Sequence, residues 1–468
     1  MRILLIRPPP VHNVLGKLTG IEVPLGLAYL ASYLETKNQN VEILDLVLSS
    51  DPKKELVKKL KNFKPKIAGI TASTVEIYNA HKIAQIIKKF LDIPVVIGGF
   101  HASSLPIETL EEFKKFDIAV YGEGEITLTN LISAFESNGD LSEINGVVYR
   151  ENDGKIKKNP PQELIKNLDT LPFPARHKLN INKYRPLMET YKQLPTTGIL
   201  TSRGCPYSCT FCSKGVYGLS YRYRSAQNVL DELKECYYKY KIKDFKFYDD
   251  CLTIPRKRLI SLCRMIFKEK LDMTWNCYSR VNTIDKELLK IMKRAGCYHV
   301  KYGVEAGSRR ILQLINKKIT LKQAINAIRN TSKVGLAAKV TFMLGLPTET
   351  EEELEKTINF AKYLDPDFVT FTITKPFPGT QIYNEALKNG DLIHKRWNEY
   401  VVDSDPILKN QLDNKILRNY IIRAYKEFYF RPKYILKKIK RLLTNISFLE
   451  LKNNIREILI MLQFRRRY

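Results

Sequence analysis

The chain has 468 residues, of which 44% are hydrophobic and 27% charged, a composition typical of folded proteins and not of a disordered chain. No apolar run is long enough to span a bilayer, and the apolar stretch after Met1 is too short for a secretory signal, so we expect a cytoplasmic protein. The formal net charge of +28 indicates affinity for phosphate-bearing partners, either nucleic acid or an anionic membrane surface. A lysine-rich composition with solvated helix faces would give the same charge.

The first 140 residues alternate short apolar runs with amphipathic stretches, which predicts an α/β fold with a parallel, doubly wound sheet. The predicted strands are Ile3–Ile6, Val41–Leu46, Ile67–Thr71, Val95–Gly98 and Ile118–Tyr121. The predicted helices include Leu25–Leu34, Glu55–Phe63 and Ile77–Phe90. Ligands of such sheets bind at the carboxyl ends of the strands, and glycines there let a large planar or phosphate-bearing ligand approach the backbone.

A joining segment over 141–195, rich in turn residues, precedes a second alternating pattern over 196–400. Its predicted strands are Gly198–Ser202, Phe245–Tyr248, Met273–Tyr278, Tyr298–Val304, Ala337–Met343 and Asp367–Ile373. Its predicted helices include Ala226–Tyr240, Lys257–Glu269, Lys286–Arg294, Leu321–Val334 and Glu351–Tyr363. Six such units predict a partial barrel whose active site lies at the C-terminal mouth of the strands. The residues over 401–468 are predicted to be helical.

Three of the eight cysteines, Cys205, Cys209 and Cys212, form a C-x3-C-x2-C motif directly after the first predicted barrel strand. Three thiolates can hold three irons of a four-iron cluster and leave the fourth iron open for substrate. A zinc site would need a fourth ligand, and no nearby His or Cys supplies one. The other five cysteines are scattered singly and are expected to be small buried hydrophobic residues.

The order of these segments resembles that of radical S-adenosylmethionine (radical SAM) enzymes with an N-terminal cobalamin-binding domain, such as the anaerobic magnesium-protoporphyrin cyclases and hopanoid-associated enzymes. The cysteine motif is specific for the superfamily. In the N-terminal region the matching segments are Val23–Leu30, Gly98–Ala102 and Tyr121–Glu125. In the predicted barrel they are Tyr248–Asp250, Tyr302–Gly307 and Phe342–Glu349. The resemblance covers nearly the whole chain and implies a Rossmann-like cobalamin domain over 1–140.

The resemblance implies three cofactors, namely a 4Fe-4S cluster on the three cysteines, S-adenosylmethionine and cobalamin. The open iron would chelate the amino and carboxylate groups of S-adenosylmethionine. One electron, from a donor such as flavodoxin or ferredoxin, would then cleave the sulfonium and give a 5′-deoxyadenosyl radical.

Further site residues follow from the same resemblance. Phe211 would screen the cluster, and Asp249 and Asp250 would bind the methionine part of S-adenosylmethionine. Helix capping is an alternative role for Asp250 and Glu349. The complete set of implied cofactor-binding residues is Ser73, Gly98, Gly99, His101, Gly122, Glu123, Phe211, Asp249, Asp250, Glu305, Gly345 and Glu349.

One feature departs from many cobalamin domains, which supply the lower cobalt ligand from an Asp-x-His-x-x-Gly segment. No such segment occurs in this chain. His12 follows the first strand but lacks the flanking Asp and Gly, so we expect a loop histidine and cobalamin bound without a histidine ligand. His101, beside Gly98 and Gly99, is a candidate for contact with the corrin, with a surface histidine as the alternative.

The predicted function is a cobalamin-dependent methyltransferase that acts on an unactivated carbon. Radical cyclisation or rearrangement, as in the magnesium-porphyrin cyclases, is the main alternative. A tRNA methylthiolation enzyme is less favoured, because such enzymes carry a second cysteine motif and this chain has no cysteine before Cys205. A cobalamin carrier that is not an enzyme would not need the cysteine motif.

The residues from Val401 onward hold 16 Lys and Arg against 6 Asp and Glu, a local charge of +10. Apolar and aromatic residues recur there at helical spacing opposite the basic ones, as in helices that lie in a membrane interface. The segment also resembles the tails of radical enzymes of hopanoid and other lipid pathways. We therefore expect peripheral membrane contact and a lipid or isoprenoid substrate, with helices that merely cover the barrel as the alternative.

Overall fold

The computed structural model describes residues 1–11, 20–151, 153–187, 190–393, 396–401, 404, 407–409 and 411–437. The chain forms two compact units. Unit 1 comprises Met1–Leu187, Gln193–Asp250 and Pro376–Ser404, and unit 2 comprises Met188–Lys192, Cys251–Lys375 and Asp405–Tyr468. Across the described ranges, no helix has both the length and the apolar character needed to cross a membrane. His12 lies outside the described residues.

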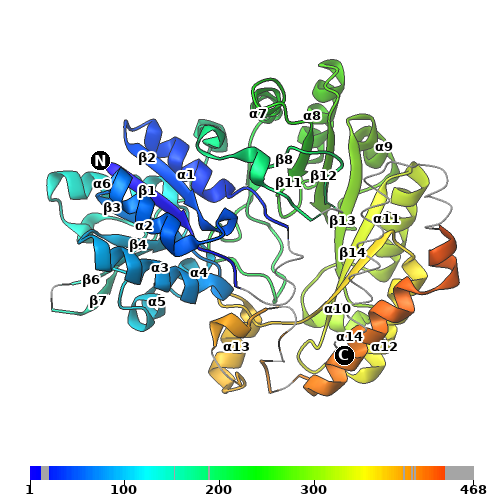
Figure 1. Ribbon diagram of the computed structural model, residues 1–468. Coiled ribbons are helices and arrows are strands. Elements are labelled where there is room, and N and C mark those ends of the chain that lie inside the picture. Colours follow the sequence, from blue (N-terminus) through cyan, green and yellow to red (C-terminus); the bar gives the residue numbers. More distant parts are fainter. Residues whose placement is uncertain are drawn as a thin grey trace. The chain divides into compact units, whose positions relative to one another are not determined.

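Unit 1 contains a seven-stranded sheet with the order β2-β1-β3-β4-β5-β6-β7 (Figure 1). Its strands are β1 (Arg2–Arg7), β2 (Asn40–Asp45), β3 (Ile67–Thr71), β4 (Val95–Gly98), β5 (Ile118–Val120), β6 (Val147–Arg150) and β7 (Ile156–Lys158). The first five strands pair in parallel, and β6 and β7 pair antiparallel. The helices are α1 (Leu25–Glu35), α2 (Pro52–Phe63), α3 (Ile77–Phe90), α4 (Phe100–Ser104), α5 (Pro106–Glu112) and α6 (Gly124–Ser137).

The core of this sheet follows from side chains that alternate between its two faces. Ile3, Leu5 and Val96 point to the face that α1 and α6 cover, where they meet buried leucines such as Leu27 and Leu131. Helices α2 and α3 pack against each other. The doubly wound arrangement places the carboxyl ends of β1, β3, β4 and β5 at one edge, as the sequence pattern predicts.

The segment expected to be only a connection contains the hairpin β6–β7. Its strands are short, and the run Val147–Tyr149 is fully buried against β5. The two strands have only four and three residues between turns, which is too short for the alternation of apolar and polar residues that predicts a strand.

The rest of unit 1 begins the second alternating pattern. Strands β8 (Thr196–Ile199) and β11 (Asp244–Phe247) pair in parallel, and helix α7 (Ala226–Tyr238) joins them. A small antiparallel ladder, β9 (Ser202–Arg203) with β10 (Arg222–Tyr223), lies between β8 and α7 in the chain. Helix α13 (Gln381–Asn389) and a short 3-10 helix, η8 (Trp397–Glu399), complete the unit.

Unit 2 continues the pattern with four parallel strands in chain order, β12 (Thr274–Ser279), β13 (Cys297–Glu305), β14 (Ala337–Leu344) and β15 (Phe368–Ile373). Its helices are α8 (Arg256–Lys268), α9 (Lys286–Arg294), α10 (Arg309–Leu314), α11 (Leu321–Val334), α12 (Glu351–Leu364) and α14 (Asn414–Tyr429). Strand β14 alternates buried and partly exposed residues, with Val340, Phe342 and Leu344 buried. Together with β8 and β11, these strands supply the six strand–helix repeats predicted for a partial barrel.

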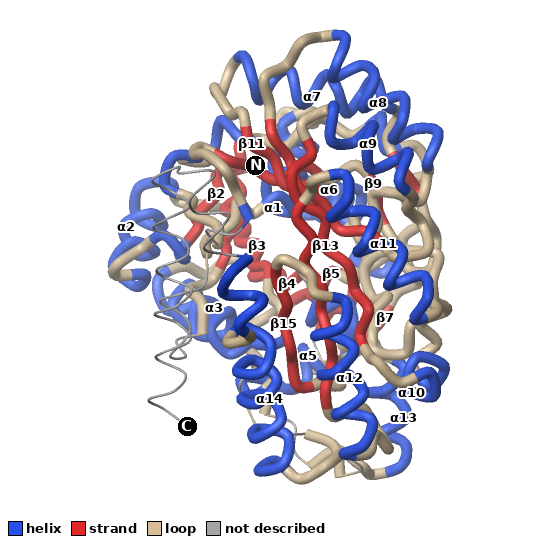
Figure 2. The backbone as a smooth tube through the Cα atoms, turned by 90° about the vertical axis from the view of Figure 1, so that its right-hand side faces the viewer, coloured by secondary structure: helices blue, strands red, loops and turns tan. Residues whose placement is uncertain are grey.

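Helix α14 covers the edge of the unit 2 sheet at β15 and packs beside α12 (Figures 1 and 2). The hydroxyl of Tyr425 accepts from the Phe371 amide at 3.1 Å and donates to the carbonyl of the same residue at 3.1 Å. Tyr429 makes the same pair of bonds to Val369, at 3.0 and 2.8 Å. The two tyrosines thus satisfy backbone groups that an edge strand otherwise leaves open. This part of the tail covers the barrel, the alternative that the sequence left open.

Candidate functional site

The three-cysteine loop begins at the β9–β10 ladder of unit 1. Gly204 precedes Cys205 with φ +82°, and a Cβ at this position would lie 2.0 Å from the carbonyl oxygen of Ser220. Only glycine fits there, since both the backbone conformation and the close approach exclude a side chain. Cys209 is buried, whereas Cys205 and Cys212 are partly exposed.

The three thiols are close enough to affect one another electrostatically. Burial raises the pKa of Cys212, the nearby Lys214 ammonium lowers it, and negative charges on Asp250, Cys205 and Cys209 raise it again. Burial and these neighbouring charges therefore disfavour the Cys212 thiolate until a cation neutralises it. Among the described residues, no three His, Cys, Asp or Glu side chains converge as the ligands of a single metal ion would. Thiolates of a four-iron cluster each bind a different iron, so they need not converge on one point, and this donor set fits that cluster.

Asp249 holds the start of the cysteine loop. Its Oδ1 accepts hydrogen bonds from the Thr201 amide at 3.1 Å, from the Thr201 hydroxyl at 2.8 Å and from the Ser202 hydroxyl. Asp249 is buried, whereas the neighbouring Asp250 is exposed. The first aspartate therefore fixes protein backbone, and only Asp250 presents its carboxylate to solvent. Phe211, between the second and third cysteines, is partly exposed.

In unit 2 the predicted residue Glu305 ends β13 at φ +74° and is buried. Its Oε1 lies 2.7 Å from Nζ of Lys317, which is also buried. The carbonyl oxygen of Lys317 accepts from Arg280. Glu305 is thus half of a buried ion pair in the same unit.

Glu349 folds back onto the end of β14. Its Oε2 accepts from the Gly345 amide at 2.7 Å and from the Leu346 amide at 3.0 Å. Burial raises the pKa of Glu349 to about 7 despite these bonds. Its Oε1 is buried and has no hydrogen-bond partner among the described residues. The second oxygen of this carboxylate can therefore accept a hydrogen bond from a ligand that carries a donor, such as the amino group of S-adenosylmethionine.

A cavity of about 210 Å³ lies in unit 1 at the carboxyl ends of the N-terminal strands. The predicted residues Gly98, Gly99, Gly122 and Glu123 line it, together with apolar side chains that include Leu5. Gly99 has φ +94°, and a Cβ there would lie 2.7 Å from Oγ1 of Thr71. The cradle is mostly apolar with glycines at its rim, which fits part of a large planar ligand such as cobalamin.

Ser73 and His101 do not line this cavity. The side chain of Ser73 donates to Oε2 of Glu76 at 2.6 Å in a capping box. His101 is 1% exposed and makes an edge contact with the Trp397 ring at 5.1 Å. Burial lowers the pKa of His101 to about 4, so the ring is neutral at physiological pH. His101 is therefore a core residue, neither the surface histidine nor the cavity-lining residue that the sequence suggested.

The structure adds cavity residues that the sequence did not indicate. Leu200, Arg203, Val216 and Tyr217, from either side of the cysteine motif, form one wall of the cavity. Arg203 donates to Oε1 of Glu123 at 2.7 Å and to Oε1 of Glu125 at 2.5 Å. The arginine directly before Gly204 and Cys205 is a hint in the sequence, but nothing there links it to carboxylates about 80 positions earlier.

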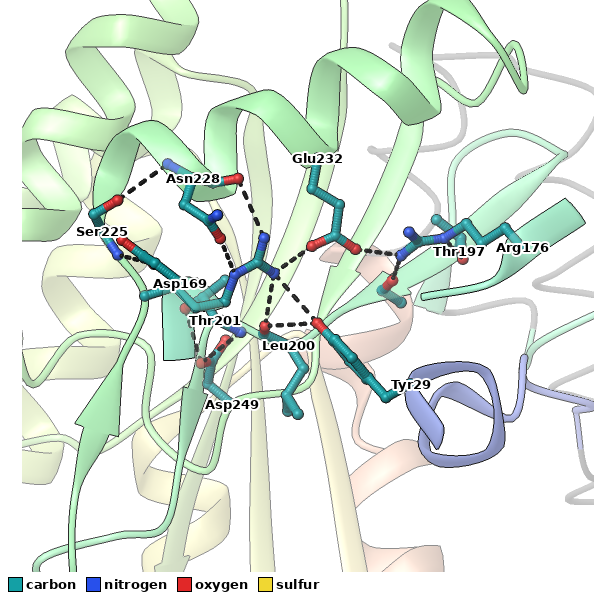
Figure 3. A network of polar contacts seen from close by, with 12 residues as sticks. Tyr29, Asp169, Arg176, Thr197, Leu200, Thr201, Ser225, Asn228, Glu232 and Asp249 are labelled. Carbon is teal, nitrogen blue, oxygen red and sulfur yellow. Dashed lines mark hydrogen bonds and ion pairs between the residues drawn. The ribbon is translucent and has the colours of Figure 1, made fainter. Parts of the chain in front are cut away.

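A buried polar network joins helix α1 to the end of β8, the first barrel strand (Figure 3). Glu232 on α7 pairs with Arg176 at 2.6 Å and with Arg224. Arg224 also donates to the Tyr29 hydroxyl at 3.3 Å and to the Leu200 carbonyl at 3.1 Å. Burial by itself would raise the pKa of Glu232, but the two arginines lower it overall. The carboxylate therefore stays charged and holds Arg224, which in turn donates to the carbonyl of Leu200, one of the cavity residues.

Comparison with family models identifies both halves of the chain. Residues 199–361 match the model of the radical SAM superfamily, and residues 11–132 match that of the B12 binding domain. An uncharacterized methyltransferase of Pyrococcus horikoshii is 39% identical over 446 residues, which cover 94% of this chain and 95% of that protein. The anaerobic magnesium-protoporphyrin IX monomethyl ester cyclase of Rubrivivax gelatinosus is 31% identical over 444 residues, 93% of this chain and 78% of that protein.

Solved structures confirm the predicted fold class. The radical S-adenosylmethionine methyltransferase TsrM of Kitasatospora setae, with cobalamin and a 4Fe-4S cluster bound, matches with a TM-score of 0.70 at 22% identity and covers 84% of this chain and 75% of that one. The cobalamin-dependent radical enzyme OxsB matches with a TM-score of 0.74 at 18% identity and covers 98% of this chain and 72% of that one. The chain therefore belongs to the radical SAM enzymes that carry a B12 binding domain ahead of the radical SAM domain.

Proposed function

We propose that this protein is a cobalamin-dependent radical SAM methyltransferase that methylates an unactivated carbon. The observation that carries the proposal is the shared wall of the unit 1 cavity, where Leu200, Arg203, Val216 and Tyr217 flank the three cysteines in sequence. A corrin in this cavity would be held by the same loop that carries the cluster. The similarity to a methyltransferase over almost the whole chain supports the same activity.

When bound, the cluster and S-adenosylmethionine supply a 5′-deoxyadenosyl radical that abstracts a hydrogen atom, and methylcobalamin supplies the methyl group. Cys205, Cys209 and Cys212 hold the cluster, and Asp249 fixes the loop that presents them. Asp250, in the same unit as the cysteines, offers its carboxylate oxygens to S-adenosylmethionine. Glycines at 98, 99 and 122 leave room for the corrin at the strand ends. The electron comes from a small one-electron donor such as flavodoxin or ferredoxin.

Radical cyclisation is the second candidate, and the 31% identity to a magnesium-protoporphyrin cyclase favours it. The two reactions differ in their products. Methylation consumes a second S-adenosylmethionine as the methyl source and releases S-adenosylhomocysteine, whereas cyclisation does not.

The experiment is an anaerobic incubation of the reconstituted protein with S-adenosylmethionine, cobalamin, a reductant and a small-molecule extract. S-adenosylhomocysteine and 5′-deoxyadenosine that rise together, and only with cobalamin present, support the methyltransferase. If 5′-deoxyadenosine forms in an extract-dependent manner without S-adenosylhomocysteine, the cyclase assignment replaces it.

For the substrate we propose a lipid or isoprenoid at a membrane surface. The hopanoid C-3 methylase of Methylococcus capsulatus is 25% identical over 369 residues. In the described tail, after the end of α14, the apolar side chains of Phe430, Ile435 and Leu436 are 54%, 42% and 66% exposed. The residues after 437 add 8 Lys and Arg against 2 Asp and Glu, a further charge of +6. Apolar side chains beside net positive charge suit an anionic bilayer surface.

A further inference from the structure

Both ends of the cysteine loop belong to the wall of the unit 1 cavity. Leu200 and Arg203 precede Cys205 in the chain, and Val216 and Tyr217 follow Cys212. The loop therefore leaves the cavity wall, carries the three thiols and returns to the same wall. Whatever fills the cavity contacts the loop at both of its ends.

Arg203 is the central side chain of this wall. Its guanidinium bridges Glu123 at 2.7 Å and Glu125 at 2.5 Å, and the three side chains are 5%, 3% and 6% exposed. The same guanidinium lies 5.5 Å from the ring centre of Tyr29 and 5.6 Å from that of Tyr217. A planar guanidinium group can donate to two carboxylates and stack on two aromatic rings at once, whereas the single ammonium of lysine cannot reproduce these contacts.

The carboxylates that hold Arg203 come from the N-terminal part of the chain and also line the cavity. Glu123 and Glu125 follow β5, on the segment that also places Gly122 at the cavity. Oε2 of Glu123 accepts from Arg222 at 2.8 Å and from the Ile165 amide at 2.9 Å. Although Glu123 lines the cavity, both of its oxygens are committed to the protein. Its role is therefore to hold Arg203 in place.

We propose that Arg203 is a positioning residue that couples occupancy of the cavity to the order of the cysteine loop, so that cobalamin and the iron–sulfur cluster bind cooperatively. The proposal rests on the placement of both cofactors given under Proposed function. A corrin packed against the wall restricts both ends of the loop, and a cluster restricts its middle. Each cofactor therefore binds to a loop that the other has already ordered, and by linkage the effect is equal in both directions.

The test is a titration of hydroxocobalamin, followed by its visible absorbance, into the full chain with and without a reconstituted cluster. For the wild type we expect the dissociation constant to be roughly five-fold or more lower when the cluster is present. For Arg203→Lys we expect the ratio of the two dissociation constants, without and with the cluster, to fall close to one, while a colorimetric iron assay still finds bound iron. The control is Arg431→Lys, which disturbs an arginine of unit 2 that pairs with Asp365 at 2.9 Å and does not line the cavity. It should lower the melting temperature and keep the wild-type ratio.

A wild-type ratio of one, or an unchanged ratio in Arg203→Lys, would overturn the coupling while leaving the proposed function intact. No cobalamin binding by any form would overturn the proposed function as well. A ratio lost equally in Arg431→Lys would show a general effect of destabilisation and would also overturn the proposal. If Arg203→Lys does not fold, Glu125→Gln removes one of its two carboxylates. For that variant the ratio of dissociation constants should lie between the wild-type value and one. A ratio equal to that of the wild type would count against the coupling.

Discussion

The guanidinium of Arg203 lies 2.7 Å from Oε1 of Glu123, a contact that joins the strand ends of the N-terminal sheet to the loop of three cysteines. Both side chains are almost fully buried, so the contact has little competition from water. It places the glycine-rich edge of the N-terminal sheet against the segment that begins the radical SAM domain. The cavity and the two ends of the cysteine loop thus share residues inside one compact unit.

The cysteine loop gives the first prediction. Cys209→Ala removes one of three thiolate ligands, so cluster assembly and cleavage of S-adenosylmethionine should be lost together. Iron content and 5′-deoxyadenosine formation measure the two effects. Cys236→Ala is the control, because this buried cysteine lies on α7, away from the motif. Cleavage that persists in Cys209→Ala would show that the metal assignment is wrong.

Glu349 predicts a pH dependence of stability. Its pKa rises from 4.5 to about 7 on folding, so the folded state binds more protons than the unfolded state between these values. The contribution of Glu349 is therefore fully favourable below about pH 4.5 and is lost as the pH rises through about 7. Relative to Glu349→Gln, the wild type should lose on the order of 3 kcal/mol over this window. Urea denaturation at several pH values measures the difference, and a difference that is constant with pH would contradict the prediction.

The tyrosine pair on α14 predicts a stability effect without a charge change. Tyr425→Phe leaves the amide and carbonyl of Phe371 without their hydroxyl partner, which should cost about 1–3 kcal/mol. Tyr429→Phe should behave alike at Val369. Tyr420→Phe is the matched control, because its hydroxyl contacts the exposed Glu351 instead of the strand backbone. Equal losses of unfolding free energy in all three variants would argue against edge capping by Tyr425 and Tyr429.

The tail predicts salt-sensitive binding to anionic liposomes. Removal of 438–468 takes away most of the tail charge while it keeps α14 on β15. Flotation with anionic vesicles should show binding by the full chain that falls with added salt and is weakened in the shortened chain. Equal binding to neutral and anionic vesicles, or strong tail-dependent binding to RNA, would contradict the membrane proposal.

Much of the fold could be predicted from the sequence, since local patterns determine it. Strand β3 and helices α3, α9 and α11 have the predicted bounds. Alternating apolar residues in a parallel sheet leave few other arrangements, and the cysteine spacing specifies the loop. The hairpin β6–β7 was missed because its strands are too short to show a period.

The candidate site was less predictable, because its key contacts join distant parts of the chain. Glu123, expected at the cofactor, lines the cavity and also pairs with Arg203 and Arg222, and no local pattern encodes that pairing. His101 was expected near the corrin, yet Trp397, almost 300 residues later, covers it. Glycines at 98, 99 and 122 do line the cavity, because their role depends on local backbone conformation at strand ends.

The most direct test of the proposed function uses S-adenosylmethionine with a deuterated methyl group, supplied to the reconstituted protein and an extract under anaerobic conditions. Mass spectrometry should find a small molecule that gains one labelled methyl group, in amounts that match S-adenosylhomocysteine and depend on cobalamin. The product should be absent with Cys209→Ala. Extract-dependent 5′-deoxyadenosine with no transfer of the label to any product would contradict the methyltransferase.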